Sequence, residues 1–227
     1  MNLVRHLLQV PWLWDLSQRM FGCDEQKRLL YRSVLRHPCK VLDFGCADGN
    51  AFPAFMDCDY YGMDIDPRLI AYAKRKYAAY PNAHFVCADV LKSPFPPSSF
   101  DAVIFGCTGH HLSDSEFLDI MGVLIEMLRE GGAIHFFDPI KDPARDPWIV
   151  KVKMAFDQGK HIRTQEQYHC LLEKLGGVFY LKTMHRLQVA GALTPQPTYL
   201  YVELRRQNRH LPLGAPSHPF AASRASA

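Results

Sequence analysis

Residues 41–49 read VLDFGCADG and residues 62–66 read GMDID, and these two stretches decide the fold. The first places a glycine turn directly after a buried strand, and the second places the carboxylate of Asp64 after the next strand. Glycine lets the backbone approach a ligand closely, and an acidic side chain after the second strand can accept both hydroxyls of a ribose. The spacing from Gly45 to Asp64 fits one strand, one helix and one strand. The pair therefore predicts a site that holds a nucleoside.

From Lys40 onward, short runs of β-branched and aromatic residues alternate with helical patterns, which is typical of crossover units on a parallel sheet. Five strands are predicted in this way, and two more follow, separated by a loop whose length suits an antiparallel hairpin at the sheet edge. The seven predicted strands span residues 40–44, 60–64, 84–88, 102–107, 133–138, 178–187 and 198–204. This order predicts an α/β domain.

Capping residues mark the starts of the predicted helices. Asp66 followed by Pro67 supplies an N-cap residue and a proline at the first helical position. The clearest helix spans residues 113–130, because Ser113 and Glu116 form a capping-box pattern before apolar residues at core spacing, and a glycine pair is expected to stop it. Two further helices are predicted at residues 148–156 and 164–175.

Composition indicates one soluble globular domain, since the 227 residues are 48% hydrophobic and 22% charged. The formal charge of +3 includes several arginines near the carboxyl end, so nothing indicates a nucleic-acid partner. Seven cysteines occur without a Cys-x-x-Cys pair or metal-ligand spacing, which predicts reduced thiols in a cytoplasmic protein. Cys87 and Cys107 lie in apolar runs and are expected to be buried. The sequence carries no signal for an oligomeric state.

The domain organisation predicted is an N-terminal helical lid over residues 1–36, a main domain over 37–206 and a disordered tail over 207–227. Within the main domain, residues 139–163 form a proline-rich insertion expected to cover a substrate. Plain surface packing and a membrane-surface helix remain alternatives for the amino-terminal segment, which is too interrupted by polar residues to insert stably in a membrane.

Further blocks lie after the glycine turn and the GMD of residues 62–64: FVCADV at 85–90, FDAV at 100–103 leading to His110 and His111, and LREGG at 128–132. Together these blocks resemble the class I S-adenosylmethionine-dependent methyltransferases, and within them the small-molecule group related to quinone and natural-product methyltransferases. The resemblance covers roughly residues 40–138. It implies a Rossmann-like, seven-stranded, mostly parallel sheet with helices on both faces and an antiparallel last strand.

The resemblance also implies S-adenosyl-L-methionine as the cofactor. Asp64 would hold the ribose hydroxyls, Asp89 the adenine amino group, and the Gly45 turn would pass beneath the methionine moiety. The backbone amide of Val90 would meet the adenine ring, and the backbone around Gly106 would face the methionine amine. The complete implied cofactor site is Asp43, Gly45, Ala47, Asp64, Ile65, Asp89, Val90 and Gly106.

This sequence departs from the family pattern at Ala47, where the middle glycine is expected, and at Glu130, where a proline is expected. Alanine permits close approach if its φ is negative, so a weaker or shifted cofactor contact is expected. A dinucleotide site fits less well, because Ala47 and Asn50 stand where a pyrophosphate loop prefers glycine. The carboxylate of Asp48 would also repel a pyrophosphate, whereas beside a sulfonium cation it is neutral or helpful.

Histidines, an arginine and a tryptophan are the candidates for removing a proton from the methyl acceptor or for binding it. His110 and His111 follow the fourth strand, and either is a candidate general base for a leaving proton. Alternatively, His111 caps the next helix and His110 only shapes the pocket; no carboxylate partner for a metal site is evident, so no metal is expected. His161, Arg163 and Trp148 in the insertion are candidate contacts for the acceptor, with solvated surface or core packing as the alternative.

The function predicted is transfer of a methyl group from S-adenosylmethionine to an oxygen or nitrogen atom of a small molecule, by in-line displacement. One alternative is a non-catalytic or repurposed cofactor-binding domain, including a cyclase that keeps the cofactor. A dinucleotide-dependent oxidoreductase is a further alternative.

Overall fold

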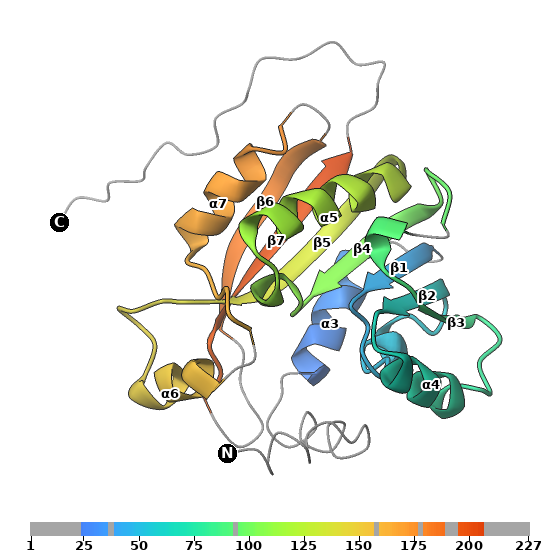
Figure 1. Cartoon of the computed structure of the whole chain (residues 1–227), viewed down its shortest axis with the longest axis horizontal. Coiled ribbons are helices and arrows are strands. Elements are labelled where there is room, and N and C mark those ends of the chain that lie inside the picture. The colour runs from blue at the N-terminus through green and yellow to red at the C-terminus, as the bar shows by residue number, and fades with distance from the viewer. Residues whose placement is uncertain are drawn as a thin grey trace.

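The computed structural model describes residues 24–35, 39–92, 95–156, 159–176, 179–188 and 195–206. Its centre is a seven-stranded sheet in the order β3-β2-β1-β4-β5-β7-β6 (Figure 1). β7 is antiparallel to both of its neighbours, and every other pairing is parallel. The predicted sheet and its antiparallel last strand are thereby confirmed. The strands are β1 (Lys40–Phe44), β2 (Asp59–Asp64), β3 (Ala83–Cys87), β4 (Phe100–Gly106), β5 (Leu128–Ile140), β6 (Phe179–Gln188) and β7 (Thr198–Arg206).

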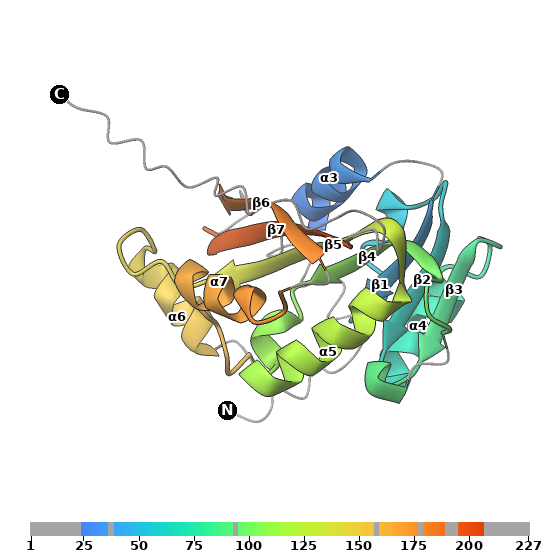
Figure 2. The same ribbon diagram turned by 90° about the horizontal axis from the view of Figure 1, so that it is seen from above.

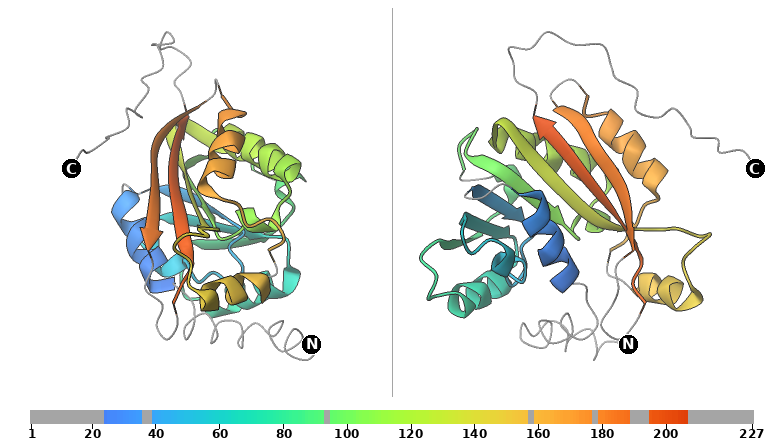
Figure 3. Two further views of the ribbon diagram at one scale, coloured as in Figure 1. Left: turned by 90° about the vertical axis from the view of Figure 1, so that its left-hand side faces the viewer. Right: turned by 180° about the vertical axis from the view of Figure 1, so that it is seen from behind.

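Helices cover both faces of the sheet, as predicted, and each layer buries its own apolar cluster. On one face lie α5 (Asp114–Met127) and α7 (Gln165–Glu173), and on the other lie α3 (Asp24–Val34) and α4 (Pro67–Lys76) (Figures 2 and 3). Successive strand residues alternate between the two layers because side chains point to opposite faces. In β1, for example, Val41 packs in the layer of α3 and Leu42 in the layer of α5.

The helices begin where the capping residues predict. Asp66 accepts a hydrogen bond from the backbone amide of Arg68 at 2.8 Å, and Pro67 opens α4. Ser113 and Glu116 form the predicted capping box of α5, which satisfies backbone donors at the helix start that have no intrahelical partner. Thr164 forms a second capping box, before α7.

The helix predicted over residues 113–130 ends earlier, at Met127, and β5 begins at the next residue. Leu128 is buried and pairs with Phe100 in the sheet, and its ψ of 141° is already that of a strand. An apolar leucine at this position suits the buried face of a helix and the interior of a sheet equally well. The glycine pair therefore lies inside the strand, where Gly131 has a φ of +73°.

Cys87 is exposed, which corrects the prediction of a buried thiol, because it ends the edge strand β3. Cys107 is half-buried. Most of the predicted lid and the whole predicted tail lie outside the described residues. Within the described ranges, no helix has both the length and the apolar character needed to cross a membrane.

The strand order places the site. Sequence order reverses between β1 and β4, which are parallel neighbours at the middle of the sheet. Ligands of open α/β sheets bind outside the carboxyl ends of the strands at such a reversal. The loops after β1 and β4 begin at Gly45 and Cys107, so the glycine turn and the segment leading to His110 meet at this edge.

Candidate cofactor and active site

The glycine turn after β1 is pressed against the loop that follows β4. Gly45 has a φ of +71°, and a Cβ atom built on it would lie 2.3 Å from Oγ1 of Thr108. The turn is also tied to β2, because the amides of Gly45 and Cys46 both donate to the carbonyl of Met63, at 2.9 and 3.1 Å. Only glycine combines this backbone conformation with so close a neighbour. The turn is therefore a backbone surface without side chains at its tightest point.

Ala47 has a φ of +49°, so the negative φ at which alanine was expected to permit close approach is not present. A non-glycine residue in this left-handed region is strained by contact of its Cβ with backbone. The conformation is supported by Asp64, whose Oδ2 accepts the amide of Ala47 at 2.9 Å. Alanine thus stands where the family has glycine, although the backbone keeps the left-handed conformation that glycine favours.

Asp64 has its carboxylate fixed at the end of β2. One oxygen holds Ala47 and the other accepts the amide of Asp66 at 2.9 Å, so the group cannot rotate freely. Each carboxylate oxygen has a further lone pair for a hydroxyl donor. The side chain is only partly buried, so a ligand can reach it.

Asp89 follows β3 and lies beside apolar surface. Its Oδ1 accepts the amide of Leu91 at 3.0 Å, while Val90 is buried. Ile65 and Leu91 are 72% and 51% exposed, which is unusual for side chains of this kind. Strands β2 and β3 are parallel neighbours, so their ends bring two carboxylates and two exposed aliphatic side chains to one place. This combination suits a flat base carrying an amino group and a ribose.

Asp43 lies beneath the turn and is buried, 4% exposed. Tyr60 donates its hydroxyl to Oδ2 of Asp43 at 2.6 Å. Burial raises the pKa of Asp43 to about 7, against the opposing effect of the Tyr60 hydrogen bond. Asp43 therefore exchanges its proton near neutral pH.

Asp48 does not supply the negative charge that the sequence suggested. The side chain is fully buried, and Lys76 of α4 reaches its Oδ2 at 3.2 Å. A compensated carboxylate neither repels a pyrophosphate strongly nor attracts a sulfonium. Contrary to the expectation from the sequence, the charge of Asp48 does not distinguish a dinucleotide from a sulfonium compound, and the distinction depends on Asp64, Asp89 and the turn.

Gly106 closes β4 beneath the hydroxyl of Tyr31, a buried residue of α3. A Cβ atom on Gly106 would lie 2.3 Å from that hydroxyl oxygen. A side chain at position 106 would thus displace α3 from the edge of the sheet. Tyr31 contributes a polar atom to the site that the sequence patterns did not identify.

His110 is paired with a carboxylate that the sequence patterns did not identify. Its Nδ1 lies 2.9 Å from Oδ1 of Asp138, which stands at the corresponding end of β5. Tyr168 of α7 donates its hydroxyl to the other oxygen of Asp138 at 2.5 Å. All three side chains are buried. Burial and the adjacent Asp138 raise the pKa of Tyr168, which keeps the phenol protonated as a donor.

His111 is exposed, and its ring lies beside that of His110 with centroids 4.2 Å apart. The amide of His161 donates to the carbonyl of His110 at 2.9 Å, which brings the end of the insertion to the histidine pair. Trp148, at the start of α6 (Trp148–Phe156), is 76% exposed. Among the described residues, no group of His, Cys, Asp and Glu side chains is arranged to hold a metal ion.

Arg163 is buried, and its guanidinium donates hydrogen bonds to nearby backbone carbonyls and to Asp114. It holds the carbonyls of Gly109 and Leu112 at 3.1 and 2.7 Å, and Oδ1 of Asp114 at 2.8 Å. These acceptors flank the short helix η3 (Gly109–His111). In addition, the amide of Lys141 donates to the carbonyl of Arg163 at 2.9 Å. Both ends of the insertion are thus fixed beside the histidines.

Comparison with known proteins decides which ligand this edge of the sheet serves. Residues 41–132 match a family described as a methyltransferase domain, and they contain the turn, both carboxylates and the histidine pair. The chain is a class I S-adenosylmethionine-dependent methyltransferase. S-adenosylmethionine is its cofactor, which argues against the alternative of a dinucleotide-dependent oxidoreductase.

Relatives agree with this assignment over most of the methyltransferase. An uncharacterized methyltransferase of Anoxybacillus flavithermus is 25% identical and covers 84% of this chain and 92% of its own length. A trans-aconitate 2-methyltransferase of Methylobacterium nodulans is 29% identical over 72% of this chain and 68% of its own. The fold is that of the N-methyltransferase NodS of Bradyrhizobium japonicum, solved with S-adenosyl-L-homocysteine, with a TM-score of 0.66, 18% identity and coverage of 91% and 97%.

Proposed function

We propose that this methyltransferase transfers the methyl group to an oxygen or nitrogen atom of a small molecule, with His110 as the general base. The relative named trans-aconitate 2-methyltransferase supports the substrate class, since its name describes action on a small carboxylic acid. The observation that carries the proposal is the buried hydrogen bond between His110, in the loop after β4, and Asp138 of β5.

The cofactor supplies an electrophilic methyl group on a sulfonium sulfur. Asp64 binds the ribose hydroxyls, and its hydrogen bonds to Ala47 and Asp66 orient it for that role. Ile65 packs against the adenine. The carboxylate of Asp89 accepts a hydrogen bond from the adenine amino group, and the backbone amide of Val90 donates one to the adenine ring. The Gly45 turn and the Gly106 backbone bind the methionine portion, with Asp43 beneath the turn. These assignments follow from the position of each group at the carboxyl ends of β1 to β4.

His110 acts as the base through the tautomer that Asp138 selects. A carboxylate accepts the Nδ1 proton of the imidazole, which places the basic lone pair of the ring on Nε2. Tyr168 occupies the second oxygen of Asp138 and fixes its orientation. A hydroxyl acceptor then passes its proton to Nε2 as it attacks. His111, whose ring lies against that of His110, is the second candidate for this role.

The insertion supplies the acceptor contacts in this proposal. The backbone of His161 is hydrogen-bonded to His110, and we assign its side chain a contact with the acceptor. Trp148 offers a largely exposed aromatic surface to an incoming acceptor. Arg163 positions η3 and does not bind the acceptor itself in this proposal. Its guanidinium donates hydrogen bonds to the carbonyls of Gly109 and Leu112, which precede and follow the two histidines.

The test measures formation of S-adenosylhomocysteine with panels of carboxylic acids, phenols and amines. With the acceptor found, Asp138→Asn is expected to lower kcat by about 10²–10⁴-fold, because the amide no longer selects the required tautomer. Affinity for S-adenosylhomocysteine is expected to be unchanged, since Asp138 lies away from the ribose carboxylate. His110→Asn is expected to match Asp138→Asn, and the His111→Asn variant serves as the comparison.

A fall in kcat with His111→Asn but not with His110→Asn would transfer the role of base to His111. Unchanged kcat in both histidine variants would refute general-base catalysis by this pair. Failure of every small acceptor, with cofactor bound normally, would refute the proposed substrate class.

A further inference from the structure

Two cysteines face each other at the edge of the sheet opposite to the cofactor site. Cys39 comes directly before β1 and Cys58 directly before β2. The first residues of these parallel strands, Lys40 and Asp59, are partners in the ladder. The amide of Asp59 donates to the carbonyl of Cys39 at 3.0 Å, so the pairing continues to the two cysteines.

The geometry of this pair suits a covalent bond. The two Sγ atoms are 2.9 Å apart and both residues are free thiols. Neighbouring strands lie about 4.7–4.9 Å apart, within the range of about 4.4–6.8 Å that disulfides accept between Cα atoms. The thiols therefore need little backbone movement to reach bonding distance.

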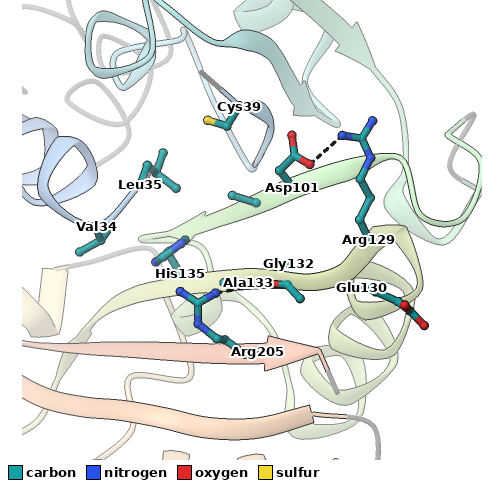
Figure 4. Close-up of a pocket in the computed structure, with 12 residues that line it drawn as sticks. Val34, Leu35, Cys39, Asp101, Arg129, Glu130, Gly132, Ala133, His135 and Arg205 are labelled. Atoms are coloured by element: carbon teal, nitrogen blue, oxygen red, sulfur yellow. Dashed lines mark hydrogen bonds and ion pairs between the residues drawn. The ribbon is translucent and has the colours of Figure 1, made fainter. Parts of the chain in front are cut away.

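The two thiols differ in access to solvent. Cys58 is buried, 2% exposed, in the apolar layer beneath α3 and α4. Cys39 is half-buried and lines a pocket at this edge of the sheet, together with Leu35, Asp101, Arg129 and His135 (Figure 4). A small reagent can thus reach Cys39 from the pocket, whereas Cys58 is shielded within the apolar layer and has its Sγ atom 2.9 Å from that of Cys39.

We infer that Cys39 and Cys58 form a redox modification site, which a low-molecular-weight disulfide converts into an intramolecular disulfide bond. The Cys39 thiolate attacks one sulfur of the reagent, forming a mixed disulfide and releasing one thiol. The Cys58 thiolate then attacks the Cys39 sulfur, forming the internal bond and releasing the second thiol. The protein loses two protons and two electrons, and the reagent disulfide is reduced to two thiols.

The bond would join positions 19 residues apart and enclose β1, the glycine turn and the rest of the connection to β2. Closing such a loop restricts the unfolded chain, so the oxidised protein is expected to be more stable. The hydrogen bond with Cys58 and burial raise the pKa of the Cys39 thiol. Exchange is therefore expected to be slow near pH 7 and faster at about pH 9, where more thiolate is present.

The experiment incubates the full chain with excess oxidised glutathione and then analyses it by mass spectrometry and thermal unfolding. We expect the peptides that carry Cys39 and Cys58 to be joined with the loss of two hydrogen atoms, and Tm to rise by roughly 6–12 °C, reversibly with dithiothreitol. Trypsin cleaves after Lys40, so Cys39 and Cys58 lie in separate peptides that should appear joined.

Three variants provide matched controls. Cys39→Ser is expected to abolish the joined peptides and the Tm shift. Cys58→Ser is expected to stop at a glutathione adduct on Cys39, because the second thiol is missing. Cys170→Ser changes an exposed cysteine of α7 and is expected to behave as the original protein. Absence of the joined peptides, a bond between other cysteines, or a wild-type protein that keeps glutathione on Cys39 would each overturn the inference.

Discussion

Ala47→Gly is expected to stabilise the protein, although it removes a methyl group. Ala47 has a φ of +49°, and the left-handed conformation costs an L-residue about 1–2 kcal/mol. Glycine avoids this cost but gives the unfolded chain more freedom, which takes back about 0.4–1 kcal/mol. The amide that donates to Asp64 is kept, so that hydrogen bond does not enter the difference. The net gain expected is about 0.5–1 kcal/mol.

For a chain of this size, 1 kcal/mol corresponds to about 2–4 °C in Tm, so Ala47→Gly should unfold roughly 1–4 °C higher. Urea and thermal unfolding without cofactor measure the effect directly. Ser98 has a φ of +57° at an exposed position, so Ser98→Gly is expected to show a gain of the same sign. Ala51 has a φ of −80°, and Ala51→Gly should instead lose about 0.5–1 kcal/mol. If Ala47→Gly loses stability as Ala51→Gly does, the reasoning from backbone strain is refuted.

Three further predictions concern single side chains. Asp64→Ala should weaken S-adenosylhomocysteine binding ten- to a hundredfold in calorimetry, if its ribose hydrogen bonds contribute about 1.5–3 kcal/mol; unchanged affinity removes Asp64 from the site. Burial raises the pKa of Asp43 to about 7. Between the pKa of Asp43 in the unfolded chain and pH 7, the folded state therefore binds a proton that the unfolded state has lost, and the free energy of unfolding falls as pH rises. Urea unfolding should therefore show a loss of about 2 kcal/mol between about pH 5.5 and 8 that Asp43→Asn abolishes, and an equal slope in the variant contradicts this. Ser113→Ala should cost about 0.5–2 kcal/mol in the same assay through the lost capping box, and an unchanged midpoint argues against it.

The parts of the fold that depend on local chemistry were predictable. Alternating strand patterns, capping residues such as Asp66 and Ser113, and the glycine turn each follow from short-range physics, and all are present. The end of α5 was not predictable in this way. Leu128 satisfies the apolar pattern of a helix and of a strand equally, and only its pairing with Phe100 decides between them.

The site residues that lie at strand ends could be predicted from the sequence. Those that reach the site from helices distant in the sequence could not. Asp138 lies near the carboxyl end of β5, beside β4, so convergence of parallel strand ends could have suggested it as the partner of His110. Tyr31 and Tyr168 reach the site from α3 and α7, and no spacing in the sequence relates them to it. The φ of Ala47 likewise depends on how the turn packs against Thr108 and Met63.

The closed attachment of the insertion has a consequence for engineering. The chain leaves β5 at Lys141 and passes from Arg163 into α7, and a backbone hydrogen bond joins these two positions. The free energy of closing a loop grows slowly with its length, so segments of other lengths can connect the same junctions at small cost. The insertion can therefore be exchanged between related enzymes. Such an exchange should transfer the preference for the acceptor and leave cofactor binding unchanged.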